Sequence, residues 1–412
     1  MTERVVRVVD VTIEKRGDVV SLEQEQDQIT AGWAEAAVTE SELDEAAPHQ
    51  HIGQEHRSRE QQVLDRIDRA RRRKPRVKEE RITLSHGAGG KATHTLIDAI
   101  FLEAFRNEQL EQMEDGATLT IGGAKLAFTT DSYVVSPLFF PGGDIGDLAV
   151  NGTVNDLAVC GARPLYLSCG FILEEGFEVE KLRQITASMA AAARTAGVQI
   201  VTGDTKVVQQ GKGDGCYINT AGVGLLDRPT PLSAGSVKPG DRILVSGPIG
   251  DHGITILLAR GELDILADIT SDTAPMHELI AGLLDAVPGV RTLRDATRGG
   301  VATILNEVAG ASQVAVVVDE AQVPVRAEVN GACELLGIDP LYVACEGRLV
   351  AVVDGAMVDD ALAALRAHPL GEGAAVIGTI KDDPPGLVLL KTTFGGTRIV
   401  DMLVGDPLPR IC

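Results

Sequence analysis

The chain has 412 residues, 44% of them hydrophobic but only 3% aromatic, with 45 glycines and a formal net charge of -21. This length suits two or three domains, with cores of small aliphatic residues and many tight turns. So acidic a chain should repel bare phosphates, which argues against nucleic acid as a partner and predicts that any nucleotide is bound through a divalent cation.

Hydropathy and cysteine spacing restrict the cellular setting. No uninterrupted apolar run reaches transmembrane length and no secretory segment is present, so we expect no membrane association. The six cysteines include no Cys-x-x-Cys pair and no cluster with zinc-ligand spacing. We therefore expect a soluble, cytoplasmic protein whose cysteines are mostly small core residues.

Residues 1–80 differ in composition from the rest of the chain. They are rich in Glu, Gln, Asp and Arg and poor in large apolar residues. Such a segment cannot bury enough apolar surface to offset its chain entropy, so we predict an extension that is largely disordered or weakly helical. Its basic run, Arg71 to Lys74, could touch an acidic partner or RNA, although a solvated linker explains it more simply.

A first α/β domain is predicted over residues 81–227. It opens with an expected strand and a glycine-rich turn, Ser85 to Lys91, which leads into an amphipathic helix. Free N–H groups at such a turn and at a helix N-terminus bind phosphate, and Lys91 would add a cation. A tight connecting turn explains the segment equally well, because it matches neither the P-loop nor the GxGxxG motif.

The pattern of apolar residues predicts the other elements of this domain. Strands are expected at 117–121, 125–130 and 199–202, and helices from Asp144 to Val159 and from Val179 to Ala196. Strands that alternate with helices in this way predict an α/β domain.

Acidic residues occur at or near the ends of these elements. Asp131 follows the second strand and Asp204 the third, whereas Asn155 and Asp156 lie deep in the first helix among apolar residues. Three carboxylates from three separate elements could form a Mg²⁺ cage for a nucleotide, namely Asp131, Asp156 and Asp204. Each alone has a simpler explanation, since Asp131, for example, could merely cap a turn.

A second domain is predicted over residues 237–400, after a connection rich in proline. Its clearest elements are two strands and one helix, at 242–246, 349–353 and 301–309. Glycine-rich turns again precede helices, at Gly247 to Gly253 and at Asp295 to Gly300. Glu346, between Cys345 and an apolar strand, is either buried or a carboxylate of a turn.

The tail, residues 401–412, ends in Pro409-Arg410-Ile411-Cys412. Two prolines stiffen the approach to the terminal cysteine. A thiol on a mobile terminus could swing between sites, or lie in a cleft while a reaction is done on it. Alternatively, the tail is a frayed end whose last residue happens to be cysteine.

Four segments resemble the ATP-dependent superfamily of aminoimidazole ribonucleotide synthetase, selenophosphate synthetase and thiamine-monophosphate kinase. They are Thr129 to Ser132, Asn155-Asp156, Gly203 to Lys206 and Asp295 to Gly300. Within this superfamily, Ser136 to Asp144 and the ending Pro409 to Cys412 are similar to the HypE family of hydrogenase maturation proteins. The resemblance covers about Ile82 to Cys412. It implies two α/β (α+β) domains with mixed sheets, and a homodimer formed through the first domain.

The resemblance also implies an activity. A carbamoyltransferase of the HypF type would load a carbamoyl group onto the thiol of Cys412, and ATP-dependent dehydration would convert it to a thiocyanate. The cyanide would then pass to iron held by a HypC–HypD scaffold, for the NiFe hydrogenase cofactor. ATP suits this dehydration, because phosphorylation turns the carbamoyl oxygen from a poor leaving group into phosphate.

The cofactors implied are ATP and Mg²⁺. The residues expected to bind the nucleotide are Lys91, Asp131, Asn155, Asp156, Asp204 and Asp295. Lys91 would contact the transferred phosphoryl group. The metal ligands would be Asp131, Asp156 and Asp204. Cys412 would be the acceptor, and the base near it would be Lys206 or Glu346, since burial can bring either pKa toward neutrality.

Two other functions are open on the sequence. A superfamily enzyme that acts on a small molecule would leave the tail incidental, and its activity would survive loss of Cys412. A non-catalytic carrier would ferry a group on the tail thiol without hydrolysing ATP.

Overall fold

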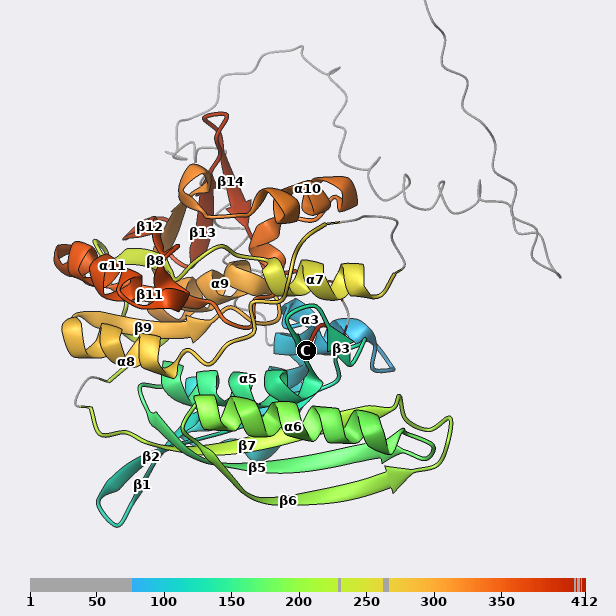
Figure 1. The fold of residues 1–412 in the computed structure, drawn as a ribbon. Helices are drawn as coiled ribbons and strands as arrows, with labels where there is room; N and C mark the ends of the chain where they lie inside the picture. Colours follow the sequence, from blue (N-terminus) through green and yellow to red (C-terminus); the bar gives the residue numbers. More distant parts are fainter. Residues whose placement is uncertain (1–75, 229–230, 262–266, 404, 406–407, 409) are drawn as a thin grey trace, which may run out of the picture. The chain divides into compact units, whose positions relative to one another are not determined.

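The computed structural model describes residues 76–228, 231–261, 267–403, 405, 408 and 410–412. The chain separates into two units, residues 1–60 and 61–412, and all described residues belong to the second. The predicted extension, residues 1–80, therefore lies outside the described residues except for residues 76–80. Within the second unit the elements form two domains with mixed sheets, as predicted (Figure 1).

The first domain is built on a five-stranded sheet in the order β1-β2-β7-β5-β6. Its strands are Ala117–Ile121 (β1), Ala124–Tyr133 (β2), Arg163–Glu174 (β5), Gln199–Val208 (β6) and Cys216–Leu225 (β7). β5 and β6 pair in parallel and the other neighbours are antiparallel. In the observed register Asp204 of β6 lies in the same row as Ser132 of β2, with β5 and β7 between them.

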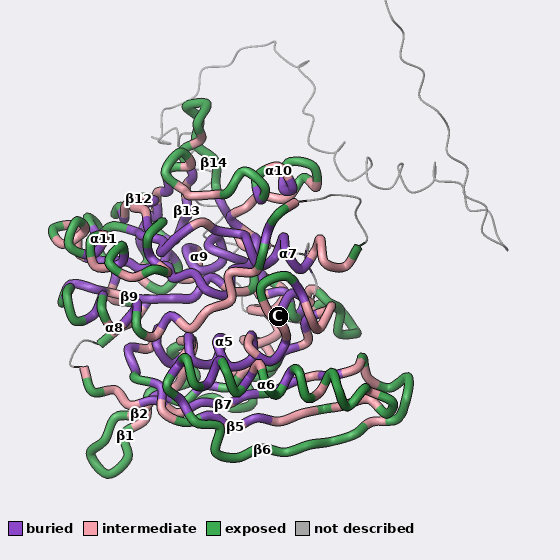
Figure 2. The backbone as a smooth tube through the Cα atoms, viewed as in Figure 1, coloured by how far each residue is buried: buried purple, intermediate pink, exposed green. Residues whose placement is uncertain are grey.

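Two helices cover one face of this sheet, α5 (Ile145–Val159) and α6 (Val179–Thr195). A short hairpin of β3 (Phe139–Phe140) and β4 (Gly143–Asp144) leads into α5. Asp144 caps α5 by accepting from the N–H group of Gly146 at 2.6 Å. α5 is buried almost all round, because it lies between the sheet and elements of the second domain (Figure 2).

The opposite face of the sheet is open in the part of the chain that the structure describes. The edge strand β6 is exposed along almost its whole length (Figure 2). Three large apolar side chains of β2 and β5, Phe128, Tyr166 and Ile172, are 43%, 49% and 44% exposed. An unpaired edge strand beside exposed apolar side chains is a surface that proteins usually cover.

The second domain contains a seven-stranded sheet in the order β14-β13-β10-β12-β8-β11-β9. Its strands are Arg242–Val245 (β8), Val290–Asp295 (β9), Ala315–Asp319 (β10), Leu349–Val353 (β11), Ala375–Lys381 (β12), Leu387–Lys391 (β13) and Thr397–Val400 (β14). β10 and β13 pair in parallel and the other neighbours are antiparallel. This sheet too is mixed, which confirms the prediction.

Helices pack on both faces of the second sheet. They are α8 (His277–Ala286), α9 (Gly300–Ser312) and α11 (Val358–Arg366), whereas α7 (Asp251–Ala259) and α10 (Ala327–Leu336) pack on each other and join the core that contains α5. β11 shows the two sides, since Val350 and Val352 join the core that includes α9, whereas Leu349 and Ala351 join the core that includes α8 and α11. A strand that is buried on both faces needs the unbroken apolar sequence that β11 has. No helix of the described residues is long and apolar enough to cross a membrane.

The glycine-rich turn does not follow a strand, contrary to the prediction. Leu84–Gly87 forms a 3₁₀ helix instead, because the Nδ1 of His86 accepts from the N–H group of Thr83 at 3.1 Å. A continuous helix follows in three segments: α3 (Lys91–Leu96), a π-helical turn (Ile97–Phe101) and α4 (Leu102–Phe105). Its predicted apolar stripe is largely exposed in the described part of the chain.

Candidate active site

Two cavities meet at Arg298, which precedes α9. The larger has a volume of about 760 Å³ and the smaller about 140 Å³, and Arg298 lines both. Its Nη1 donates to the carbonyl oxygen of Gly87 at 3.0 Å, and its Nη2 lies 4.0 Å from Asp131. Arg298 thus borders two adjoining spaces, of which the smaller is also lined by Cys412.

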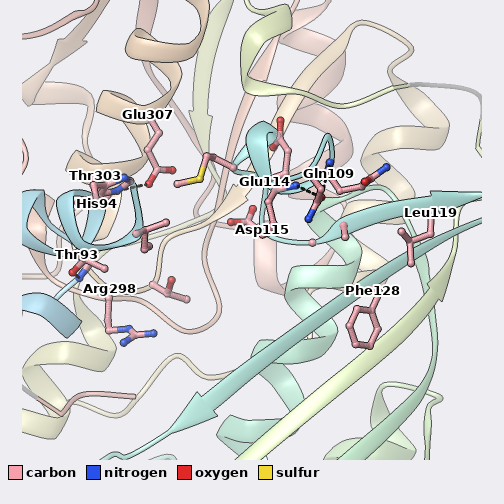
Figure 3. A pocket seen from close by; sticks show the side chains of 18 residues that line it. Thr93, His94, Gln109, Glu114, Asp115, Leu119, Phe128, Arg298, Thr303 and Glu307 are labelled. Carbon is pink, nitrogen blue, oxygen red and sulfur yellow. Dashed lines mark hydrogen bonds and ion pairs between the residues drawn. The ribbon is translucent and has the colours of Figure 1, made fainter. Parts of the chain in front are cut away.

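The larger cavity has a polar side and an apolar side (Figure 3). Arg298 lies on the polar side with His94 and Glu307, whose side chains form an ion pair at 3.2 Å. Leu119 of β1 and Phe128 of β2 lie at the apolar side. A cavity of this size, with a few polar groups in an apolar surround, suits a small molecule such as a nucleotide.

The glycine-rich turn borders the larger cavity through Gly89. This residue has a φ of +74°, and a Cβ there would lie 2.7 Å from the carbonyl oxygen of Arg298. The turn is therefore a close packing contact that also borders the cavity, and its binding of phosphate stays a prediction. The ammonium group of Lys91 forms an ion pair with Asp401 and lines neither cavity. Lys91 would have to leave Asp401 to reach a phosphate.

Asp131 lies close enough to Asp156 and to Asp295 to raise the pKa of both, and Asp295 also raises that of Asp156. They come from β2, from α5 and from the end of β9. Burial, and then the charges of Asp295 and Asp131, raise the pKa of Asp156 well above its usual range, although Thr129 donates to it at 2.9 Å. Burial likewise raises the pKa of Asp295 to about 8. A bound cation would relieve this repulsion, so the cluster suits a Mg²⁺–nucleotide complex.

Asp115 is a further carboxylate of this region that sequence reasoning missed. It precedes β1, and burial raises its pKa to about 6 even though the buried guanidinium of Arg294 donates to it at 2.7 Å. Arg294 also holds Glu114 at 2.5 Å. No local pattern marks Asp115, because its main partner lies 179 positions away in the chain.

The predicted metal cage is only partly assembled. Asp131 and Asp156 come together, whereas Asp204 lies apart on β6. Among the described residues no group of three or more His, Cys, Asp or Glu side chains has the geometry of a metal site. Two carboxylates nevertheless fit Mg²⁺ in a nucleotide site, because phosphate oxygens and water supply most of its ligands there.

Asp204 and Lys206 are exposed on the edge strand, where they form an ion pair with each other. Its hydrogen bond to Lys206 lowers the pKa of Asp204. Lys206 pairs in register with Ile172, whose side chain faces the open side of the sheet. Strands are about 4.8 Å apart, so β6 and β2 are separated by roughly 14 Å. Within one chain Lys206 therefore cannot reach Cys412.

Glu346 is a buried carboxylate, which decides between the two interpretations that its sequence allowed. Burial, followed by the charges of Asp295 and Asp131, raises its pKa well above the usual range. Its Oε1 has no hydrogen-bond partner among the described residues, while its backbone N–H group donates to Asp272 at 2.9 Å. Such a carboxylate is a strong base once it is ionised.

Asn155 joins α5 to the second domain. Its side-chain amide donates to the carbonyl oxygens of Ala274 and Glu346 at 3.0 and 3.3 Å, and its oxygen accepts from the N–H group of Met276 at 2.7 Å. These bonds occupy both donors and one acceptor position of the amide. The structure thus places Asn155 beside the loop of Glu346, with little capacity left for a nucleotide.

The end of the tail is docked on the protein, with Leu408, Ile411 and Cys412 buried. The N–H groups of Val134 and Ser136 donate to the carbonyl oxygens of Cys412 and Arg410 at 2.9 and 3.2 Å. Ile411 and Cys412 belong to the core of the first domain. The structure therefore records a docked position of the tail that the sequence predicts to be mobile.

His252 and Arg260 hold the tail backbone in this position. The Nε2 of His252 lies 2.6 Å from the carbonyl oxygen of Ile411, and its Nδ1 lies 2.7 Å from the Oγ of Ser271. Since a carbonyl oxygen only accepts, Nε2 carries the proton and Nδ1 accepts from Ser271. Burial lowers the pKa of His252 to about 4, which keeps the ring neutral. Arg260 donates to the carbonyl oxygen of Arg410 at 3.0 Å.

Sequence reasoning assigned no role to Arg298 or His252. Their position in the sequence could have indicated a role, because each lies in a glycine-rich turn that precedes a helix. What the sequence could not show is that both turns face the chain terminus.

Comparison with known proteins relates both domains to one family. Residues 113–226 match the N-terminal domain of AIR synthase related proteins, and residues 238–390 match their C-terminal domain. Over 337 residues the chain is 54% identical to carbamoyl dehydratase HypE of Cupriavidus necator, an overlap of 82% of this chain and 96% of that protein.

Two solved structures are also similar to this chain. A chain of a HypE–HypF complex is 47% identical, with a TM-score of 0.71 and coverage of 75% of this chain and 99% of its own. HypE in complex with ATP is 49% identical, with a TM-score of 0.68 and coverage of 81% and 100%. The two domains are those of an AIR synthase related protein, and within that class the chain belongs to the HypE family.

Proposed function

We propose that this protein uses ATP to dehydrate a carbamoyl group, carried on the thiol of Cys412, to a thiocyanate. The observation that carries the proposal is the position of the chain terminus. Cys412 lies at a small cavity that shares Arg298 with a cavity of nucleotide size. The name of a close relative, carbamoyl dehydratase, and the ATP complex of another support the same assignment.

ATP would occupy the larger cavity. Its base would lie toward Leu119 and Phe128, and its phosphates toward Gly89 and Arg298. Mg²⁺, held by Asp131 and Asp156 of the acidic cluster, would neutralise phosphate charge in a site that otherwise repels it.

The proposed reaction has two steps whose atoms balance. The carbamoyl oxygen attacks the γ-phosphorus, ADP leaves and one N–H proton is lost, which gives a phosphorylated imidate on sulfur. The second N–H proton is then removed, the C–O bond breaks, and phosphate leaves as the S–C≡N group forms. Glu346 is the proposed base within the chain, and Arg298 would stabilise the transferred phosphoryl group.

A second copy of the chain is the proposed cover for the open face of the first sheet. It would bury the exposed β6 and the apolar side chains of Phe128, Tyr166 and Ile172. It would also give Asp204 and Lys206 a role, since these residues could act at the site of the other copy. The proposed active unit is therefore a homodimer.

The other proposed partners follow from the chemistry of the tail. A carbamoyltransferase of the HypF type must load the thiol, and a HypC–HypD scaffold would accept the cyanide for a NiFe hydrogenase. A HypE–HypF complex among the similar structures supports the first of these. None of the six cysteines, all of which the structure describes, forms a disulfide that would compete with the proposed reaction on a thiol in the cytoplasm.

Intact mass spectrometry tests the proposal. With the carbamoyl donor system the protein should gain one carbamoyl group, and it should then lose the mass of one water when ATP is added. Truncation after Ile411 should abolish both changes. The matched control is Cys345→Ala, which removes a buried thiol beside Glu346 and should still load.

Each contrary outcome identifies an alternative. A truncated chain that still loads and dehydrates would overturn the proposal. ATP turnover that survives truncation would favour a synthetase or kinase that acts on a small molecule. Loading without any use of ATP would favour a carrier.

A further inference from the structure

We propose that Asp272 is a positioning residue for the dehydration, because its buried carboxylate fixes the backbone of Glu346 and so holds the side chain of Glu346 in place for proton removal. The inference rests on the proposed function in one respect, since it takes Glu346 as the base. It gives a role to residues 271–276, a segment without helix or strand that precedes α8 and is called the connecting segment below.

The backbone of Glu346 is held from both sides. Its N–H group donates to the Oδ1 of Asp272 at 2.9 Å, and its carbonyl oxygen accepts from the side-chain amide of Asn155 at 3.3 Å. The side chain of Glu346 is buried, and its Oε1 has no hydrogen-bond partner among the described residues. The protein thus fixes the backbone and leaves the carboxylate available, which is the arrangement that a general base requires.

The carboxylate of Asp272 is itself closely confined. Its side chain is 1% exposed, and its Oδ2 lies 3.4 Å from the Nε of Arg348. Since Arg348 follows Glu346 by two residues, Asp272 holds the loop 346–348 at both ends. Gly347 allows the connecting segment to lie directly on this loop, because a Cβ at that position would be 1.9 Å from the carbonyl oxygen of Asp272.

The connecting segment also supports the docked tail, through a different residue. The Oγ of Ser271 donates to the Nδ1 of His252 at 2.7 Å, and the Nε2 of His252 donates to the carbonyl oxygen of Ile411 at 2.6 Å. The supports of the tail and of the base are therefore adjacent in the chain but separate in their contacts. Loss of the Asp272 carboxylate should disturb the base and leave the tail supported through Ser271.

Removal of this carboxylate tests the inference in protein that carries a carbamoyl group. Asp272→Ala should lower the single-turnover rate of thiocyanate formation about 10²-fold, a factor typical of a reacting group displaced by about 1 Å. Asp272→Asn keeps an oxygen that can accept from Glu346, so it should lose less than about tenfold. Carbamoyl loading of Cys412 should be unchanged in both variants. In protein that already carries Glu346→Gln, the further change Asp272→Ala should have no effect, because Asp272 acts through Glu346.

The matched control is Asp251→Ala. Asp251 is a buried carboxylate of the same ionic network, since it lies 2.9 Å from the Nε of Arg326 and 3.9 Å from the Nη2 of Arg348, but it does not hold the N–H group of Glu346. Arg348 keeps the carbonyl oxygen of Pro248 as a partner in both alanine variants, so the fold should persist. Asp251→Ala should lower the urea midpoint as Asp272→Ala does, yet lower thiocyanate formation less than about threefold.

A measurement without ATP or a carbamoyl donor separates this inference from the proposed function. The amide of Glu346 should exchange with deuterium about tenfold faster in Asp272→Ala, because it loses its acceptor, and at the normal rate in Asp251→Ala. The amide of Cys345, which donates to the carbonyl oxygen of Ala296 at 2.8 Å, is the internal reference. Residue-resolved mass spectrometry reads both amides.

Three outcomes would overturn the inference. They are unchanged exchange at Glu346 in Asp272→Ala, equal losses of activity in Asp251→Ala and Asp272→Ala, and a further loss when Asp272→Ala is added to Glu346→Gln. If the exchange changes as expected but the unmodified protein forms no thiocyanate, the proposed function fails while the placement of Glu346 by Asp272 stands.

Discussion

The two faces of the first sheet carry aspartates in different surroundings. On the inner side, Asp131 lies near Asp156 and Asp295, two carboxylates of other elements whose pKa values are raised by burial and by neighbouring carboxylates. On the outer side, Asp204 is exposed, and its pKa is lowered by Lys206. In the sequence these residues look alike, since each follows or ends an apolar stretch. The difference teaches that one copy of the chain provides the acidic cluster and the tail, whereas the outer pair needs another surface to act on.

The sharpest test of this contrast between the two faces is the removal of the ammonium group of Lys206 on the outer face. Lys206→Ala should lower thiocyanate formation by about 10³-fold if the amine takes part in proton transfer. The fold should be unaffected, because the side chain is exposed and contacts only its neighbour Asp204. Single-turnover formation of thiocyanate from loaded protein measures the effect.

Mixing two inactive variants shows whether Lys206 acts on the other copy. Protein with Lys206→Ala and protein with Cys412→Ala should each be inactive, and activity should return when their subunits exchange. Full activity of the Lys206→Ala protein would remove the outer face from the mechanism.

The inner cluster should respond to the loss of one charge. Asp156→Asn should keep the fold and lower ATP turnover about 10²-fold, because a negative charge is lost where Mg²⁺ and phosphate must be held. Turnover measured against Mg²⁺ concentration checks this. Asp227→Asn, which removes an exposed carboxylate paired with Arg163, is the control and should behave as the unmodified protein. Unchanged turnover in Asp156→Asn would exclude Asp156 from the site.

The inner side also holds the tail, and His252 allows an isosteric test. Asn mimics the Nδ1 side of the ring and Gln mimics the Nε2 side, which is the side that donates to Ile411. His252→Asn should therefore raise the rate at which iodoacetamide alkylates Cys412 about tenfold, whereas His252→Gln should raise it less than threefold. Equal rates in the two variants would show that the ring only fills space.

The smallest expected effect concerns the stability of the ligand-free protein. Because the folded state raises the pKa of Asp295 from about 4 to about 8, the folded state binds this proton more tightly than the unfolded state. Stability should therefore fall as pH rises through this range. Asp295→Asn should raise the free energy of unfolding at pH 8 and flatten this pH dependence.

The outer aspartate provides the comparison for that measurement. Asp204→Asn should leave the urea midpoint unchanged at both pH 5 and pH 8, because the carboxylate is fully exposed. A pH dependence that is the same in Asp295→Asn and in the unmodified protein would show that Asp295 does not titrate in this range.

Regular elements could be predicted closely from the sequence, because the pattern of apolar residues is local. The expected strands at 117–121 and 349–353 coincide with β1 and β11, and the helix expected from Val179 ends one residue early, at Thr195. The prediction of a strand before the glycine-rich turn was wrong. The N–H group of Thr83 donates to the side chain of His86, and a 3₁₀ helix forms where the strand was expected. The pattern of apolar residues contains no sign of such a hydrogen bond.

The candidate site could be predicted only in part, because burial and facing depend on contacts distant in the chain. The types of residue were foreseen for Asp131, Asp156 and Glu346, each of which lies close to an apolar stretch of the sequence. The same reasoning could not predict that Asp131 lies on the covered face of the sheet and Asp204 on the open face. Which face a strand residue occupies depends on the register and packing of the whole sheet. Arg298 and Asp115 depend on partners far away in the sequence and were therefore missed.

The short ladder between the tail and residues 134–136 has a consequence for observing the molecule at work. The amide hydrogens of Val134 and Ser136 are each shielded by a carbonyl oxygen of the tail. When the tail departs, both lose their acceptor and exchange with deuterium from solvent. The rate of hydrogen–deuterium exchange at these two amides thus reports the fraction of time that the acceptor cysteine spends away from the cavity.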